Sequence, residues 1–288
     1  MENPNRYFLI ASILLISTFC RSYEEMSMAE DKAILKLKAS ETFFQEYYTN
    51  DPKDSTKIHW LSTGCNKSNR KPILIFIHGS PGNWVNYLKY LTDPQLLEKY
   101  CMYAVDRPGF GKSSSPIPNV NLQADRISTS LLQLIDPKGK LIVLLGHSYG
   151  GPVAARMAST SPEIFTHLFL LAAAMDPKFE EVRWYNKIAD TGFGKWILPE
   201  EWTHSNSEML SLKEQLEILT QEWKKIKSHT VIVQGEDDGL VDARNTEFIR
   251  AEFSPQTELE IILLPKEGHF IPWKNFDLIR KLLLDILK

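Results

Sequence analysis

Six short apolar segments, separated mostly by stretches of helical character, limit the folds open to this chain more than any other feature. They are Ile73–Ile77, Tyr100–Val105, Leu141–Leu145, His167–Leu171, Thr230–Val233 and Leu259–Leu264. Continuous apolar runs of this length are typical of strands buried on both faces. Helical candidates occupy residues 84–98, 121–135, 149–160, 243–252 and 273–287. The alternation predicts an α/β fold with a mostly parallel central sheet and helices on both faces.

Length and composition agree with a soluble α/β protein. The 288 residues suffice for one large domain or two small ones, and 43% are hydrophobic and 24% charged, which excludes a disordered chain. The net charge is −3. A non-specific nucleic-acid binder needs a surplus of cations, so we predict no nucleic-acid partner.

Residues 1–22 resemble a targeting segment. The uncharged run Tyr7–Phe19 has 13 residues, which is short for crossing a bilayer but suits the apolar part of a secretory signal. Cys20 closes the run and is a candidate for lipid attachment. We therefore predict a signal peptide or a membrane or lipid anchor, and an exported or membrane-anchored protein, periplasmic or otherwise extracytoplasmic. A buried helix of the folded domain is the alternative.

The other two cysteines, Cys65 and Cys101, form an even pair once Cys20 is removed or modified. In an oxidising compartment they are candidates for a disulfide. Two buried free thiols are an equally acceptable interpretation.

The rest of the chain divides into three parts. Residues 23–56 are a mixed lead-in, interpreted as a helix or as a helix and a strand. Residues 57–175 and 229–288 contain all six predicted strands. Residues 176–228 lack a strong strand and predict a helical insertion, or cap. This insertion holds four of the seven tryptophans, Trp184, Trp196, Trp202 and Trp223. We expect them to pack within the insertion, and they also suggest an apolar substrate moiety.

A nucleophile motif, Gly146-His-Ser148-Tyr-Gly150, lies between the strand 141–145 and the helical candidate 149–160. A tight strand-to-helix turn lifts such a serine above the sheet, and only small residues fit two positions before and after it. The start of the following helix favours negative charge beside the serine. Ser148 is therefore the candidate nucleophile.

A serine needs a base and an acid that orients the base. His269 is the candidate base, since it lies in a loop just after the strand 259–264, where sites of open α/β sheets form. His147 lies within the turn itself, so we expect its ring to point away and pack. Among Glu236, Asp237 and Asp238, which follow the strand 230–233, Asp238 is favoured because Gly239 after it permits a tight turn. Asp176 is a further candidate, although it more simply starts a turn at Pro177.

Acyl transfer also needs two backbone N–H donors for the developing oxyanion. The residue after the nucleophile, Tyr149, supplies one. The loop His78-Gly-Ser80-Pro-Gly82, directly after the strand 73–77, is expected to supply the other from Ser80.

The segment Asp106-Arg-Pro-Gly-Phe-Gly-Lys-Ser113 ends like a phosphate-binding loop. The loop motif requires glycine where Asp106 stands, and prolines follow where a helix should begin. We reject nucleotide binding and expect Asp106 and Arg107 to tie a loop beside the site.

Taken together, the motifs HGSPG, DRPGFGKS, GHSYGG, GEDDGLV and GHF, in this order, resemble the α/β-hydrolase family over residues 57–288. The resemblance implies Ser148 as nucleophile, Asp238 as acid, His269 as base, the amides of Ser80 and Tyr149 as oxyanion hole, and residues 176–228 as the cap. A serine nucleophile argues against epoxide hydrolases and haloalkane dehalogenases. HGSPG differs from the HGGPG of proline iminopeptidases, and the HGGG of many lipases is absent.

The sequence thus predicts a serine hydrolase that cleaves an ester, thioester, lactone or amide of a small-molecule acyl substrate through an acyl-enzyme. The chemistry requires no metal and no cofactor. An acyltransferase, a haloperoxidase-like enzyme or a C–C bond hydrolase would use the same triad. A non-catalytic binding protein of the same fold is the alternative from a different class.

Overall fold

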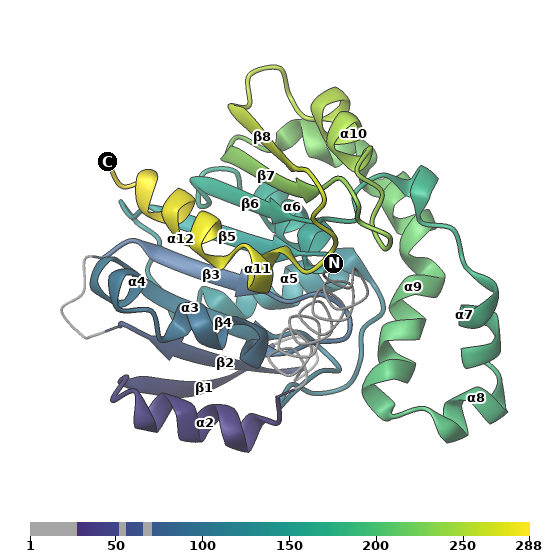
Figure 1. The fold of residues 1–288 in the computed structure, drawn as a ribbon, viewed down its shortest axis with the longest axis horizontal. Helices are drawn as coiled ribbons and strands as arrows, with labels where there is room; N and C mark the ends of the chain where they lie inside the picture. Colours follow the sequence, from purple (N-terminus) through teal and green to yellow (C-terminus); the bar gives the residue numbers. More distant parts are fainter. Residues whose placement is uncertain (1–27, 52–55, 66–70) are drawn as a thin grey trace, which may run out of the picture.

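The computed structural model describes residues 28–51, 56–65 and 71–288, and its centre is one eight-stranded sheet (Figure 1). The strand order is β1-β2-β4-β3-β5-β6-β7-β8. The strands are β1 (Phe44–Asn50), β2 (Lys57–Thr63), β3 (Ile73–Ile77), β4 (Cys101–Asp106), β5 (Ile142–His147), β6 (His167–Leu171), β7 (His229–Gly235) and β8 (Leu259–Leu264). From β4 to β8 all neighbours are parallel, whereas β1 and β2 add an antiparallel edge. The predicted mostly parallel α/β fold is confirmed.

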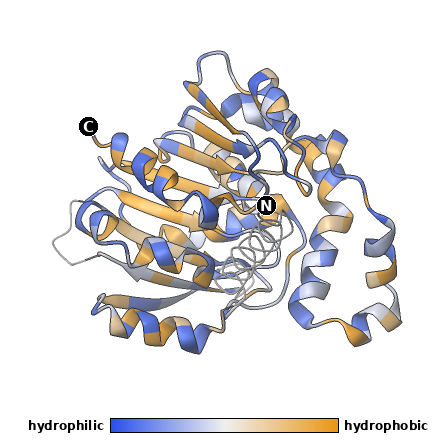
Figure 2. Cartoon of the chain, in the orientation of Figure 1, coloured by the Kyte–Doolittle hydropathy of each residue, from blue (hydrophilic) through white to orange (hydrophobic). Residues whose placement is uncertain are grey.

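Alternate side chains of the central strands pack into two separate hydrophobic cores, one on each face of the sheet. In β3, Ile73, Ile75 and Ile77 point into one core, and Leu74 and Phe76 point into the other. This follows from the two-residue period of a strand. Since both faces are covered, every residue of β3, β4 and β5 is buried. Figure 2 shows these strands as nearly continuous hydrophobic bands.

Helices cover each face. The first core receives side chains from α5 (Val120–Leu131), α6 (Gly150–Thr160), α9 (Glu200–Leu219), η3 (Thr220–Lys225) and α10 (Asn245–Glu252). The second receives side chains from α2 (Glu30–Ala39), η1 (Trp84–Tyr87), α3 (Leu88–Leu91), α4 (Pro94–Lys99), α11 (Ile271–Lys274) and α12 (Phe276–Asp285).

Two of the predicted helices are interrupted. Residues 84–98 form η1, α3 and α4, because Asp93 caps a new helix and Pro94, which has no N–H, occupies its first turn. Residues 273–287 give α11 and α12 with a break at Asn275. The lead-in forms both a helix, α2, and a strand, β1.

Between β6 and β7 lies an all-helical insertion that contains η2 (Pro177–Phe179), α7 (Trp184–Ala189), α8 (Gly192–Ile197), α9 and η3. Figure 1 shows it beside the sheet, with α7 and α8 at its outer edge. Of the four tryptophans in this insertion, Trp223 alone is buried. Trp184, Trp196 and Trp202 are 73%, 81% and 54% exposed, so the expectation that the tryptophans pack within the insertion is wrong for three of the four.

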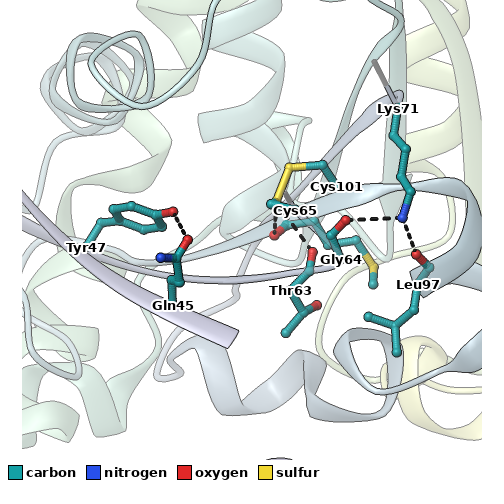
Figure 3. Close-up of a disulfide and its surroundings, with 9 residues drawn as sticks. Gln45, Tyr47, Thr63, Gly64, Cys65, Lys71, Leu97 and Cys101 are labelled. Atoms are coloured by element: carbon teal, nitrogen blue, oxygen red, sulfur yellow. Dashed lines mark hydrogen bonds between the residues drawn. A yellow bond between two sulfur atoms is a disulfide. The ribbon is translucent and has the colours of Figure 1, made fainter. Parts of the chain in front are cut away.

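Cys65 and Cys101 form a disulfide, with their Cα atoms 4.4 Å apart (Figure 3). The bond joins the end of β2 to the start of β4, which are antiparallel neighbours in the sheet. Beside it, Lys71 Nζ donates hydrogen bonds to the carbonyl oxygens of Gly64 and Leu97 at 3.2 and 2.7 Å. Of the two interpretations of these cysteines, the disulfide is the one present.

The predicted targeting segment, residues 1–22, lies outside the described residues. Among the helices that the structure does describe, none combines the length and the hydropathy needed to cross a bilayer.

Candidate active site

Ser148 lies at the tight turn between β5 and α6. Its φ angle is +53°, the left-handed region that non-glycine residues rarely adopt. Hydrogen bonds hold this geometry from both sides: Ser148 N donates to Leu171 O at 3.0 Å, and Ser148 O accepts from Gly151 N at 2.9 Å. The turn therefore presents its serine in the manner predicted from the motif.

Two glycines make the turn possible. A Cβ at Gly146 would lie 2.4 Å from Gly150 O, and one at Gly150 would lie 2.3 Å from Ile77 O. Both contacts are with backbone atoms, which cannot move aside without displacing β3 or α6. The requirement for glycine is thus steric rather than conformational, since neither residue has a positive φ.

His269 and Asp238 are joined directly. His269 Nδ1 donates to Asp238 Oδ2 at 2.9 Å, and the Asp238 side chain is fully buried. The other oxygen, Oδ1, accepts from the backbone N–H groups of Leu240 and Val241 at 2.8 and 2.9 Å. Burial opposes ionisation of Asp238, but the hydrogen bonds outweigh it and hold the pKa of this carboxyl below its ordinary value. An Nδ1–H bonded to a carboxylate leaves Nε2 as the basic nitrogen.

The competing acids are arranged differently. Glu236 and Asp237 are exposed, and Asp176 caps η2 by accepting a hydrogen bond from Lys178 N at 2.9 Å. Of the four candidates, Asp238 alone reaches a histidine. The hydrogen bonds of the described residues thus join the acid to the base, and none of them joins the Ser148 hydroxyl to His269.

His147 does not point away from the site. Its ring packs against the His269 ring with centroids 4.8 Å apart, and its Nε2–H donates to His269 O at 3.0 Å. Burial, with the charge of His269 as the second cause, lowers the pKa of His147 to about 3. The expectation of a packing role holds, but the neighbour is the candidate base, whose backbone His147 supports.

The two predicted oxyanion donors both have free N–H groups. Neither Ser80 N nor Tyr149 N donates to another of the described residues. The HGSPG loop and the Ser148 turn are adjacent, since a Cβ built on Gly79 would lie 3.0 Å from Ser148 Cβ. Two N–H groups without a partner, next to a serine at the start of a helix, could stabilise a negative charge that develops on a substrate oxygen.

Comparisons with known proteins agree with this fold. Residues 72–196 match the model of the alpha/beta hydrolase fold. The chain has the α/β-hydrolase fold. It is 29% identical to human epoxide hydrolase 4 over 121 residues, which cover 41% of this chain and 32% of that protein. The chain thus spans about a third of this curated relative.

Solved structures match over a greater length. A membrane phospholipase A described as a bacterial virulence factor superposes with a TM-score of 0.62 at 20% identity, covering 97% of this chain and 98% of that one. A thermophilic esterase gives a TM-score of 0.58 at 21% identity, with 85% and 98% covered. At these identities the likeness establishes the fold.

A buried ion pair ties the insertion of this α/β hydrolase to the HGSPG loop. Glu208, on α9, accepts from Arg107 Nη1 at 2.5 Å and from the Ser80 hydroxyl at 2.5 Å. Arg107 also donates to the carbonyl oxygens of His78 and Gly79, both at 2.9 Å. Glu208 is 2% exposed and Arg107 is completely buried. The sequence predicted that Arg107 ties a loop, but nothing in the motifs indicated Glu208.

Asp106 organises a second set of contacts. It accepts hydrogen bonds from Trp84 N at 2.8 Å and Lys112 N at 2.9 Å, and it pairs with His59 at 2.7 Å. These contacts explain why glycine is absent where a phosphate loop would need it. Asp106 folds its own loop instead of leaving an anion cradle.

One group of described residues has the donors for a metal. Ligand atoms of Glu30, Glu46 and His59 lie within 4.8 Å of one another. Lys112 Nζ lies 2.9 Å from Glu30 and 2.5 Å from Glu46. The ammonium group pairs with both carboxylates, and His59 contacts Glu46, so we interpret the cluster as an ion-pair network.

Glu180, at the start of the insertion, is an unusual carboxyl near the acid. Its Oε1 is buried and has no hydrogen-bond partner among the described residues. Burial is the main cause that raises the pKa of Glu180 to about 7, and the charges of Asp176 and Asp238 raise it further against the opposing effect of Arg183. A group with this pKa changes charge near neutral pH beside the active site.

Proposed function

We propose that this α/β hydrolase is a serine hydrolase that cleaves a carboxylic ester, thioester, lactone or amide through an acyl-enzyme on Ser148. The main support is the pairing of His269 with buried Asp238, which follow β8 and β7 at the same edge of the parallel sheet as the Ser148 turn at the end of β5. A scaffold alone has no need for a charged pair in this place.

In the proposed mechanism, His269 Nε2 removes the Ser148 proton as the hydroxyl oxygen attacks the substrate carbonyl carbon. The N–H groups of Ser80 and Tyr149 stabilise the resulting oxyanion. His269 then protonates the leaving group, and the same ring activates the water that releases the acyl group. Asp238 keeps the ring in the required tautomer and stabilises its charged form.

Carboxylic esters are the favoured substrates within this set. Two structural neighbours are named as a phospholipase and an esterase, and both act on ester bonds by those names. The relative named epoxide hydrolase points to a different reaction. The serine at the nucleophile position argues against epoxide opening, for which the family uses an aspartate.

Export or membrane anchoring is proposed for the same protein. The apolar run Tyr7–Phe19 resembles a signal or anchor, and the Cys65–Cys101 disulfide favours an oxidising compartment. The helical insertion is proposed to act as the cap that shapes the acyl-binding region.

The test uses a series of p-nitrophenyl esters and a fluorophosphonate probe on the wild type and on Ser148→Ala. We expect the wild type to hydrolyse short esters and to react with the probe, and Ser148→Ala to lose several orders of magnitude in rate. Activity retained in Ser148→Ala would contradict the assignment of the nucleophile. A wild type that neither reacts with the probe nor hydrolyses any ester would favour a binding protein.

A further inference from the structure

The outer part of the insertion exposes a concentrated set of large hydrophobic side chains. Of the fifteen that are exposed among the described residues, seven lie in residues 184–202. They are Trp184, Tyr185, Ile188, Phe193, Trp196, Ile197 and Trp202, and we call them the aromatic face. Single exposed apolar residues are ordinary, but a cluster of this kind on a soluble surface marks a contact with something apolar.

The spacing of these residues gives each short helix an apolar side without a protein partner. Trp184 and Ile188 are four residues apart on α7, and Phe193, Trp196 and Ile197 have the equivalent spacing on α8. Residues at such spacing share one side of a helix. In Figure 1 these two helices lie at the outer edge, with α9 between α7 and the sheet.

The composition of this segment indicates which kind of surface would cover the aromatic face. Residues 183–202 contain three cations, Arg183, Lys187 and Lys195, and three acids, Asp190, Glu200 and Glu201, so the segment carries no net charge. Asp190 pairs with Lys195 at 2.8 Å. No ion pair is found for Lys187 within the described part of the chain, and Arg183 lies close enough to Glu180 for its charge to lower the pKa of that carboxyl. Exposed tryptophan and tyrosine side chains, which have an apolar ring and a polar tip, are typical of segments that lie in the interface of a bilayer.

The position of the first described residues is also consistent with a bilayer on the side of the molecule where the insertion lies. Glu30, near the first described residue, pairs with Lys112 at 2.9 Å, and Gly109 O in the same loop accepts from His204 of α9 at 2.7 Å. The described chain therefore begins close to the insertion. Eight residues separate Met28 from the apolar run Tyr7–Phe19.

From these observations we propose that the aromatic face docks on the surface of a lipid bilayer. The ends of α7 and α8 would insert Trp184, Phe193 and Trp196 at headgroup depth, with Arg183 and Lys187 against lipid phosphates. Docking concerns the insertion alone and is independent of the chemistry proposed for Ser148.

The experiment uses the full chain with Ser148→Ala, so that lipids are not consumed, and vesicles of equimolar phosphatidylcholine and phosphatidylglycerol. The test variant is Phe193→Ser with Trp196→Ser. The matched control is Phe43→Ser with Leu35→Ser, because Phe43 is 66% exposed and Phe193 is 67% exposed, on different parts of the surface. Vesicle flotation should show binding weakened by about tenfold or more in the test variant and unchanged in the control.

A second readout separates docking from attachment through the N-terminal run. Hydrogen exchange of residues 184–202 should slow when the chain is bound to vesicles, and this protection should be absent in the test variant. Exchange that stays the same with and without vesicles would overturn the proposal. So would a dimer of the parent chain that the test variant converts to a monomer, because a second copy would then be the occupant. Probe labelling of the same substitutions with Ser148 intact verifies that the variants fold.

Discussion

At the scale of single residues, burial distinguishes Asp238 from the acids beside it. Its side chain is fully buried and bonded to His269, while Asp237 is exposed. Asp238→Asn keeps the size of the side chain but removes the charge that selects the Nδ1–H tautomer. We expect kcat for ester hydrolysis to fall by about 10⁴-fold.

The matched control is Asp237→Asn, which makes the same chemical change one residue earlier. Its carboxylate does not reach the histidine, so kcat should stay within about twofold of wild type. A larger loss for Asp237→Asn than for Asp238→Asn, measured with one p-nitrophenyl ester, would show that the acid has been assigned to the wrong residue.

Glu180 gives a pH-dependent prediction. Its pKa rises from an ordinary 4.5 to about 7 in the folded protein, mainly through burial. The folded state therefore binds more protons than the unfolded state between these values, and the contribution of Glu180 to stability falls as the pH rises through that window. Glu180→Gln should raise the free energy of unfolding by roughly 1–3 kcal/mol near pH 8 and change it little near pH 4.

Urea denaturation at both pH values provides the measurement for Glu180. Parallel pH profiles for Glu180→Gln and wild type would rule out this carboxyl as the source of the dependence. A Glu181→Gln variant is the control, because Glu181 is an exposed neighbour of the same type.

At the scale of secondary-structure elements, α9 holds the HGSPG loop, the proposed source of one oxyanion donor, in place through one carboxylate. Glu208 contacts both the Ser80 hydroxyl and Arg107, which in turn binds two carbonyl groups of the loop. Glu208→Gln retains hydrogen bonding but leaves the Arg107 charge buried and unpaired. We expect a loss of about 3–5 kcal/mol in stability and a fall of kcat by roughly 10–100-fold, because the Ser80 N–H is displaced.

The split between kcat and KM tests whether Glu208 positions the loop. Displaced oxyanion donors should lower kcat and the rate of fluorophosphonate labelling, with KM for a short ester little changed. A Glu200→Gln variant on the same helix should behave as wild type, since its side chain is 86% exposed. Normal kcat together with a lowered melting temperature would mean that Glu208 only stabilises the fold.

The helices and strands also show which local sequence patterns were sufficient to predict secondary structure. The apolar strands and the capped helices were predictable because burial on both faces leaves a continuous pattern in the sequence. β2 was not predicted as a strand, since Lys57–Thr63 mixes polar and apolar residues at the antiparallel edge. Glu208 gave no signal, because one acid on a charged helix looks like any solvated residue until its distant partner is known.

For the whole molecule, motif order predicted most of the candidate site. Ser148, Asp238 and His269 come from three separate loops, yet each follows a strand, and parallel strands direct their carboxyl ends to one edge. The insertion could not be predicted in the same way. Tryptophans ordinarily pack inside, and only the arrangement of α7 and α8 reveals that Trp184 and Trp196 face outward.

The Cys65–Cys101 disulfide joins the antiparallel edge of the sheet to β4, and its removal tests how much it contributes to the stability of the fold. Cys65 and Cys101 are 36 residues apart, and a loop of this length predicts about 4 kcal/mol of stabilisation through the unfolded chain. Reduction should therefore lower the urea midpoint of the wild type. A variant with both Cys65→Ser and Cys101→Ser should start at the lower midpoint and be insensitive to reductant. Alkylation of Cys65 and Cys101 in the native, unreduced protein, mapped by mass spectrometry, would exclude the bond. β2 and β4 would then be held together by their hydrogen bonds and side-chain packing alone.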